Sequence, residues 1–180
     1  MRRFLCLLTF FFLCLTASAQ DLSQLNQGQA DTLEAGMLVL GGWAIINILF
    51  SSFKLTKATR SRKYFYQMNV YWNIVNLLIA SFALYTILSK DSATLSLSDS
   101  LYLHGWYKKL LYLSVGLDAG FIMLGAYLKE HSRWSAKAEQ MQGWGQSVLL
   151  QGLFLLLLDL VLVILLETYT NDFFQLVGKV

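Results

Sequence analysis

Four stretches of about twenty mainly apolar residues constrain this chain more than any other feature. They cover residues 34–53, 66–88, 109–128 and 146–167. Each approaches or exceeds the ~20 residues that an α-helix needs to cross the hydrocarbon core of a bilayer. The composition agrees, since 14% of the 180 residues are charged and 56% are hydrophobic, whereas soluble domains have about 25% charged residues. We therefore predict an all-α fold, a four-helix transmembrane bundle over residues 34–168.

The first nineteen residues have the pattern of an export signal. Two arginines precede a short apolar run, and the small residues Ala-Ser-Ala end it at residue 19. Because the run is too short to span a bilayer, we predict a cleaved signal peptide over residues 1–19, with an uncleaved anchor as the alternative. A polar extracytoplasmic lead (20–33) and a short tail (169–180) would flank the bundle. Both cysteines lie in the signal, so the mature protein would have no thiol ligand or nucleophile.

The charges between the apolar stretches indicate the orientation. Residues 54–63 contain five basic side chains and no acidic one, and the third loop contains Lys129, Arg133 and Lys137 against two glutamates. Since basic loops stay cytoplasmic, we predict both basic loops inside and both mature termini outside, in a bacterial inner (cytoplasmic) membrane. Trp43, like other aromatic residues near the ends of the stretches, is interpreted as partly interfacial.

Three asparagines follow one another along the second apolar stretch. Asn69, Asn73 and Asn76 are spaced i, i+4, i+7, which confines them to an arc of about 60° on one helix face. Amide groups that face hydrocarbon are costly. We therefore predict that this face looks into the protein.

Two aspartates lie within the third and fourth apolar stretches. A central Asp costs about 2.5–3.5 kcal/mol on insertion scales. With a rise of ~1.5 Å per residue, Asp118 lies roughly 13 Å and Asp159 roughly 12 Å below the outer boundary. Asn47 and Asn76 lie at roughly 18–20 Å by the same rule. We therefore predict one polar layer that contains groups from all four helices.

This polar layer has two interpretations. Two adjacent carboxyl groups cannot both ionise cheaply, so one would hold or share a proton. That favours a proton- or cation-handling site with the asparagine amides as ligands or orienting groups. The alternative is a structural clamp of hydrogen bonds between helices, each worth only about 0.6 kcal/mol on average. For the asparagines the clamp is the better interpretation, and for the two aspartates both stay open.

Small residues predict where helices pack closely. Gly116 and Gly120 form a GxxxG pattern around Asp118, and Gly125 follows further along. Such faces let helix backbones approach each other in lipid. The pattern is common by chance in apolar helices, so it is weak support for a homo-oligomer, and Gly120 would serve equally well to admit a neighbouring helix close to Asp118.

The sequence has no motif of a known catalytic or metal site. There is no phosphate-binding glycine loop, HExxH helix or nucleophile elbow. His104 and His131 lie near opposite ends of one helix, so they cannot hold a single metal or haem and are interpreted as interfacial. We predict no catalytic residue, no metal, no cofactor and no enzyme. A net charge of +3 that includes the signal arginines does not indicate a nucleic-acid partner, so the expected partners are lipid, a second copy or another membrane protein.

Three segments contain distinctive combinations of polar and apolar residues. They are YFYQMNVYWNIVNLLIA (64–80), VGLDAGFIMLGAYL (115–128) and GWGQSVLLQGLFLLLLDL (143–160). These segments resemble an uncharacterised family of small four-helix membrane proteins from Bacteroidetes-type bacteria. The resemblance implies MNxxWNxVN, LDxG and QGxFLxxxD motifs, but it implies no activity. It adds Gln151 to the polar layer and directs attention to one set of positions: Asn69, Trp72, Asn73, Asn76, Asp118, Gln151 and Asp159.

Two functional hypotheses follow from the sequence. The leading one is a non-enzymatic integral membrane protein, either a stand-alone bundle or an accessory subunit whose polar layer keeps the helices in register. The other is a small proton- or ion-coupled transporter or channel subunit that uses Asp118 and Asp159, because acids inside a membrane are functional candidates.

Overall fold

A computed structural model describes the backbone of residues 2–178 and the side chains of residues 22–178. Throughout this part of the chain the regular structure is helical, which confirms the predicted all-α class with four long helices. The predicted signal peptide (1–19) lies outside the residues whose side chains are described and stays a prediction. The elements are α1 (Arg2–Leu55), α2 (Arg60–Leu88), η1 (Ser92–Thr94), α3 (Leu97–His131), η2 (Ser132–Trp134) and α4 (Ala138–Val177).

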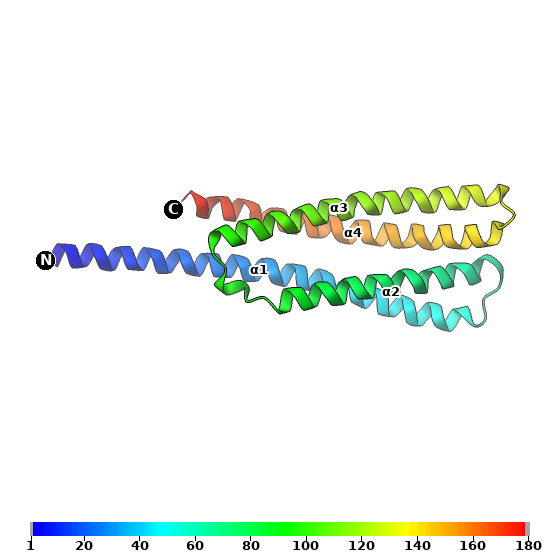
Figure 1. Cartoon of the computed structure of the whole chain (residues 1–180), viewed down its shortest axis with the longest axis horizontal. Helices are drawn as coiled ribbons and strands as arrows, with labels where there is room; N and C mark the ends of the chain where they lie inside the picture. The colour runs from blue at the N-terminus through cyan, green and yellow to red at the C-terminus, as the bar shows by residue number, and fades with distance from the viewer. Residues whose placement is uncertain (1, 179–180) are drawn as a thin grey trace.

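The long helices form two antiparallel hairpins that lie side by side, α1 with α2 and α3 with α4 (Figure 1). Both hairpin turns lie at one end of the bundle, which we call the basic-turn end because residues 54–63 lie there. The opposite end, where η1 joins the hairpins and α4 finishes, is the terminal end. α4 packs against all three other helices, so side chains on α4 connect the two hairpins.

The helices are longer than the predicted spans. α2 has 29 residues and α4 has 40, which correspond to about 44 and 60 Å at 1.5 Å per residue, against a hydrocarbon core of about 30 Å. Within residues 22–178, four segments are long and apolar enough to cross a membrane, with mean hydropathies between 1.5 and 2.8. They are Leu22–Leu55, Arg60–Leu88, Leu97–Trp134 and Ala138–Val177. The bundle therefore extends beyond the thickness of the hydrocarbon core.

The extra length at the terminal end has local causes. Ser96 caps α3, since its Oγ accepts from Asp99 N at 3.2 Å and donates to Asp99 Oδ2 at 2.7 Å. This reciprocal cap starts the helix well before the predicted span. The described part of the polar lead continues α1 as helix, and it buries Asn26, Gln29 and Leu33. The lead is thus an element of the bundle and packs against other helices.

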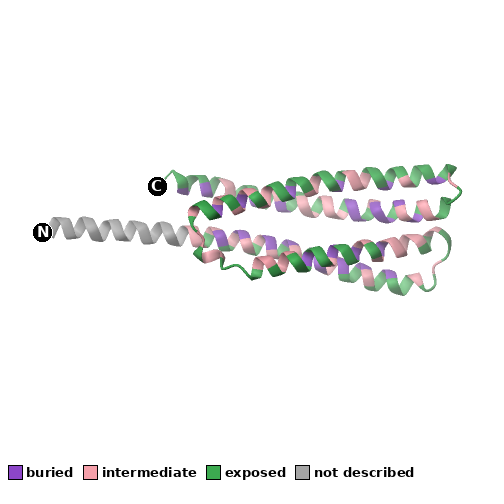
Figure 2. Ribbon diagram, in the orientation of Figure 1, coloured by how far each residue is buried: buried purple, intermediate pink, exposed green. Residues whose placement is uncertain are grey.

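Burial here differs from that in a soluble bundle, since many large apolar side chains are exposed and many polar ones are buried. Figure 2 shows where the buried and exposed residues lie along the helices. Large apolar side chains such as Ile46, Leu78 and Phe82 are 66–70% exposed, whereas Asn69 and Asn73 are 0–2% exposed. A continuous exposed apolar surface marks contact with something other than water. Together with the length and hydropathy of the helices, this pattern is that of a membrane protein.

An apolar cluster fills the bundle toward the terminal end. Its buried members are Leu33 on α1, Leu111 on α3, and Leu162 and Leu166 on α4. Gly36 permits this packing, because a Cβ at that position would lie 2.7 Å from Leu162 Cδ2. Partly buried residues surround the cluster: Met37, Ile87, Tyr107, Leu158 and Val163.

Candidate functional site

Asn69 on α2 is the centre of a hydrogen-bonded network that joins three helices. Its Nδ2 donates to Asn47 Oδ1 at 2.9 Å and to Ser51 Oγ at 2.7 Å, both on α1. Its Oδ1 accepts from Gln151 Nε2 on α4 and from Asn73 Nδ2 at 3.4 Å. An asparagine amide offers two donors and one oxygen with two lone pairs, so Asn69 is fully bonded. We call Asn47, Ser51, Asn69, Asn73 and Gln151 the amide network.

Trp43 on α1 extends this network. Its Nε1 donates to Gln151 Oε1 at 3.0 Å, and its carbonyl oxygen accepts from Asn47 Nδ2 at 2.9 Å. The indole also stacks on Phe154 of α4, with ring centroids 4.0 Å apart. Trp43 thus contacts α4, and the interfacial placement expected from the sequence stays a prediction. Gln151 uses both ends of its amide between the two hairpins.

The other two asparagines of α2 are buried with part of their bonding capacity unused. Asn73 Nδ2 donates to Asn69 O at 2.8 Å, but Asn73 Oδ1 has no hydrogen-bond partner among the described residues. Asn76 Nδ2 has no partner either. Because all three asparagines are at most 4% exposed, this face of α2 does look into the protein. A buried polar atom without a partner costs about 1–3 kcal/mol.

Asp118 on α3 and Asp159 on α4 lie together, and we call them the acid pair. Their carboxyl groups lie close to each other, and the side chain of Ser114 lies close to Asp159. Two carboxyl groups can hydrogen-bond only when one holds a proton, since a carboxylate only accepts. No amide, hydroxyl or N–H group of the described residues bonds to Asp118 Oδ2. Two carboxyl groups at such close range do not both ionise cheaply, so we expect the pair to hold one proton between them.

The single polar layer expected from the sequence is divided between two levels. On α4, Asp159 follows Gln151 by eight residues, which is about 12 Å along the helix. The amide network therefore lies nearer the basic-turn end, and the acid pair lies nearer the terminal end. On α2, which runs parallel to α4, Asn76 follows Asn69 by seven residues and so lies close to the level of the acid pair. The depth estimates missed this division because flanking charges do not fix the offset between helices.

The predicted packing glycines divide into two groups. A Cβ on Gly125 would lie 2.7 Å from Leu149 N and 2.9 Å from Gly145 O, so α3 and α4 meet backbone to backbone there. A Cβ on Gly116 or Gly120 would meet no atom of the described chain within 4 Å. These two glycines thus do not pack against another helix of the same chain, because the face of α3 that they occupy points away from α4.

The glycine that brings α4 close to the acid pair is one that the sequence did not single out for that role. At Gly152 a Cβ would lie 3.3 Å from Asp118 O and 3.0 Å from Ile122. The close approach of the two backbones allows the short Asp118 side chain to reach its partner on α4. A glycine facing an aspartate on another helix is the signal that could have found this contact.

A second polar cluster at the terminal end was not predicted. His104 on α3 is buried, with Nδ1 2.6 Å from Gln29 Oε1 on α1 and Nε2 2.9 Å from Thr170 Oγ1 on α4. Lys108 Nζ donates to the same Thr170 Oγ1 at 3.1 Å and pairs with Glu167 Oε2 at 2.6 Å. His104 therefore donates from Nδ1 to Gln29 and accepts the Thr170 hydroxyl proton at Nε2. We call this cluster the terminal node. It gives His104 partners on two other helices that the sequence did not indicate, and the interfacial level predicted for this histidine stays a prediction.

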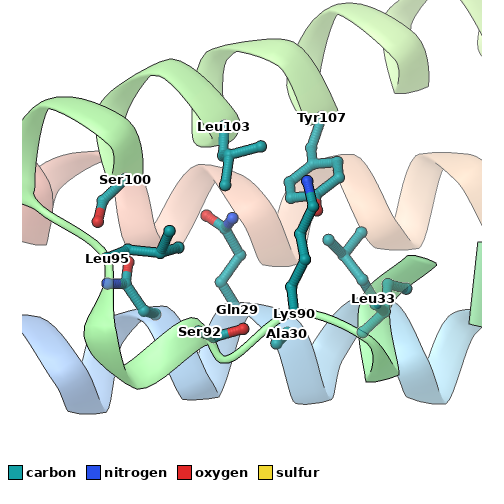
Figure 3. A pocket seen from close by; sticks show the side chains of 11 residues that line it. Gln29, Ala30, Leu33, Lys90, Ser92, Leu95, Ser100, Leu103 and Tyr107 are labelled. Atoms are coloured by element: carbon teal, nitrogen blue, oxygen red, sulfur yellow. The ribbon is translucent and has the colours of Figure 1, made fainter. Parts of the chain in front are cut away.

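A small pocket lies beside the terminal node, between α1, α3 and the η1 segment (Figure 3). Its volume is about 20 Å³, which is room for about one water molecule. Gln29, Ser100 and Tyr107 contribute polar atoms to its lining, and Lys90 extends across it toward Tyr107. The pocket is too small for an organic ligand, and it does not include either member of the acid pair.

Within residues 22–178 no group of three or more His, Cys, Asp or Glu side chains comes together. The acid pair offers two carboxyl groups and the Ser114 side chain. Chemically, this arrangement can hold and release a proton, and it can link α3 to α4.

One family model matches the chain over residues 39–160, and its description is DUF6992, a family of unknown function. The chain belongs to the DUF6992 family. The matched segment contains the amide network and the acid pair, whereas Gln29 and Thr170 of the terminal node lie outside it. No curated protein and no solved structure matches the chain.

Proposed function

We propose that this member of the DUF6992 family is a non-enzymatic, multi-pass protein of a bacterial inner membrane. Both mature termini would lie outside, with the basic-turn end in the cytoplasm, since residues 54–63 have five basic and no acidic side chains. In this role the chain is a bundle, alone or as an accessory subunit, whose interior keeps two hairpins in a fixed register.

The observation that supports this proposal is the amide network across the two hairpins. Gln151 on α4 donates to Asn69 on α2 and accepts from Trp43 on α1. In lipid, apolar side chains give little preference for one helix neighbour over another, so packing and polar contacts determine the pairing. Each amide that loses its partner leaves a buried polar group at a cost of about 1–3 kcal/mol. The network thus acts as a specific clamp.

Purification from native membranes in a mild detergent tests this proposal. The chain carries an affinity tag, and the mass of the native complex is measured for wild type and for Gln151→Leu. A partner of fixed stoichiometry identifies an accessory subunit, and a single chain identifies the stand-alone bundle. A Gln151→Leu variant with wild-type thermal stability and wild-type assembly would contradict the clamp.

A second candidate function is proton coupling, and the acid pair favours it. The carboxyl groups of Asp118 and Asp159 lie close to each other, and acids inside a membrane span are functional candidates. Proton flux is measured in liposomes with an internal pH dye, for wild type, Asp118→Asn and Asp159→Asn. Coupling requires flux in wild type and its loss in both variants while the bundle stays folded. Equal flux in all three samples, or none in wild type under any gradient, would exclude this function.

A further inference from the structure

The buried polar atoms that have no partner are unevenly distributed along the bundle. Within residues 22–178 there are six: Asn26 Nδ2, Asn73 Oδ1, Asn76 Nδ2, Asp118 Oδ2, Trp144 Nε1 and Ser147 Oγ. Five of them lie from the acid pair toward the basic-turn end. The sixth, on Asn26, lies at the terminal end beside the small pocket. The interior on the basic-turn side therefore has hydrogen-bonding capacity that the protein itself does not satisfy.

These atoms and the amide network follow one line through the interior. Trp144, Ser147 and Gln151 are spaced i, i+3, i+7 on α4, so they share one face. Gln151 bonds to Asn69 on α2, from which Asn73 and Asn76 continue toward the acid pair along the buried face. From Ser147 to Asp159 is twelve residues, or about 18 Å. We call this line of side chains, from Trp144 to Asn76, the polar track.

The other side of the acid pair is apolar. The buried apolar cluster begins three residues beyond Asp159, at Leu162, and continues to Leu166. From α1 and α3, Leu33 and Leu111 complete it. Its four leucines are at most 8% exposed, and a well-packed apolar core excludes water. The acid pair thus lies at the boundary between a polar interior and an apolar one.

We propose that water enters the bundle from the basic-turn end along the polar track and gives the acid pair one-sided proton access, which the apolar cluster closes toward the terminal end. A hydronium ion that arrives along the track would give a proton to a carboxylate oxygen of the pair and become water, and the reverse transfer to a track water would release the proton by the same route. This proposal rests on the second candidate function and describes its closed state, to which it adds the side from which the site is reached. The flux that this function requires would need the apolar cluster to open in turn. This proposal also assigns a role to the three asparagines of α2.

The chemistry of the track favours water and protons over a metal cation. Its neutral amides and its hydroxyl both donate to and accept from water, and its indole N–H donates to water. Each ordered water that bridges two such groups satisfies atoms that would otherwise cost about 1–3 kcal/mol each. A hard cation such as Ca²⁺ needs about 6–8 oxygen ligands, more than the acid pair and Ser114 supply.

Cysteine accessibility from each side of the membrane tests this proposal. Single cysteines replace Ser147 and Asn76 on the track and Leu162 in the apolar cluster, in a chain with Cys6→Ser and Cys14→Ser. Leu78→Cys is the matched lipid-facing control on the same helix as Asn76, since Leu78 is 66% exposed. Exposed positions at the two ends, Ala136→Cys and Ser89→Cys, report which side of a sealed vesicle is outside.

The probe is Ag⁺, a charged ion that is close to water in size and binds thiolates, and the buffer is free of chloride. Thiols that remain free are counted with a maleimide after denaturation, so that an oxidised cysteine is not mistaken for a protected one. Ser147→Cys and Asn76→Cys should react from the basic-turn side at least about tenfold faster than Leu162→Cys and Leu78→Cys, as expected for sites open to water against sites that require local opening. Neither should react from the terminal side.

Equal rates at track, cluster and lipid-facing positions would overturn the proposal, as would reaction from the terminal side. Gel filtration in detergent establishes whether each variant folds. Because Ser147→Cys is nearly isosteric, the test remains decisive even if Asn76→Cys does not fold. Proton flux is a separate readout. If labelling is one-sided but no proton flux is measured, the water route along the polar track is supported and proton-coupled transport is excluded. If flux is measured but labelling is not one-sided, transport is supported and this water route is excluded.

Discussion

The two halves of this bundle are stabilised in different ways. On the basic-turn side, glycines bring the helix backbones together and amide side chains line the space between them. Gly125 lies against Gly145 and Leu149, and Asn69 uses all its bonding capacity across three helices. On the terminal side, four leucines form a conventional apolar core, and the terminal node closes it.

This difference teaches where a membrane bundle obtains its specificity. Leucines pack well but are as compatible with acyl chains as with one another, so they give little preference for one helix register. Amides and backbone contacts at glycine require particular partners. We therefore expect the basic-turn half to determine which helices pair, and the terminal half to contribute mainly close packing. The acid pair lies where the two kinds of interior meet.

The largest expected effect comes from filling a glycine contact in the basic-turn half. Gly125→Leu would drive a side chain into Leu149 N and Gly145 O, and backbone cannot move aside as a side chain can. We expect a loss of about 3 kcal/mol or more, measured by unfolding in detergent. Gly116→Leu on the open face of the same helix is the control and should be near wild type. If the two variants lose the same amount of unfolding free energy, the Gly125 face of α3 is not the one that packs against α4.

The next effect should come from the apolar cluster. Leu166 is fully buried, so Leu166→Ala opens a cavity that costs about 2 kcal/mol or more. Ile164 is 65% exposed, and Ile164→Ala should change the free energy of unfolding little. If Leu166→Ala were as mild as its control, the terminal half would not be a packed core. The helix pairing itself, read by crosslinking, should survive Leu166→Ala.

A smaller loss of stability, with a larger loss of specificity, is expected for the amide network. Gln151→Leu removes one of the two donors to Asn69 Oδ1 and the acceptor of Trp43 Nε1, and it should cost about 1–2 kcal/mol. The control is Gln67→Leu, whose amide bonds only to the exposed Tyr71 hydroxyl. Crosslinks between α2 and α4 should decrease in the first variant and persist in the second. If the α2–α4 crosslinks persist in both variants, the amide network does not determine which helices pair, and the glycine contacts alone would do so.

The smallest effect is expected at the terminal node. Thr170→Val removes the hydroxyl that joins His104 to Lys108, for a loss of about 0.5–1.5 kcal/mol. Thr168→Val is matched two residues away, where the hydroxyl bonds only to Leu165 O at an exposed position. Thermal unfolding of both variants gives the comparison. A Thr168→Val loss as large as that of Thr170→Val would mean that the node adds nothing specific.

Much of this arrangement could be predicted from the sequence. The i, i+4, i+7 spacing of Asn69, Asn73 and Asn76 places them on one face of a helix. Because amides exposed to lipid are costly, this face was expected to look into the protein. The depth estimate brought Asp118 and Asp159 to one level, because each was counted from a charged residue at the same side of the membrane. The periodicity of the sequence and the free-energy cost of polar groups in hydrocarbon were therefore enough to predict the buried face of α2 and the common level of the two aspartates.

What could not be predicted is how the helices are rotated and offset against one another. Gly116 and Gly120 satisfy the GxxxG pattern as well as any residues in the chain, but α4 lies against Gly125. Trp43 is typical of an interfacial ring, and its role became visible only beside Gln151. The buried His104 depends on Gln29, in a segment that the sequence predicted to be a polar lead. Such contacts depend on side chains from several helices at once.

The shared proton of the acid pair is tested most directly by infrared spectroscopy of the reconstituted protein. The carbonyl band of a protonated carboxylic acid is recorded at neutral pH for wild type, Asp118→Asn and Asp159→Asn, with Asp99→Asn as a control for an exposed carboxyl. We expect one protonated carboxyl group per chain in wild type. Its carbonyl band should shift or disappear in Asp118→Asn and in Asp159→Asn, and it should be unchanged in the Asp99→Asn control. Absence of that band in wild type, or an identical band after either single substitution, would contradict a proton held between Asp118 and Asp159.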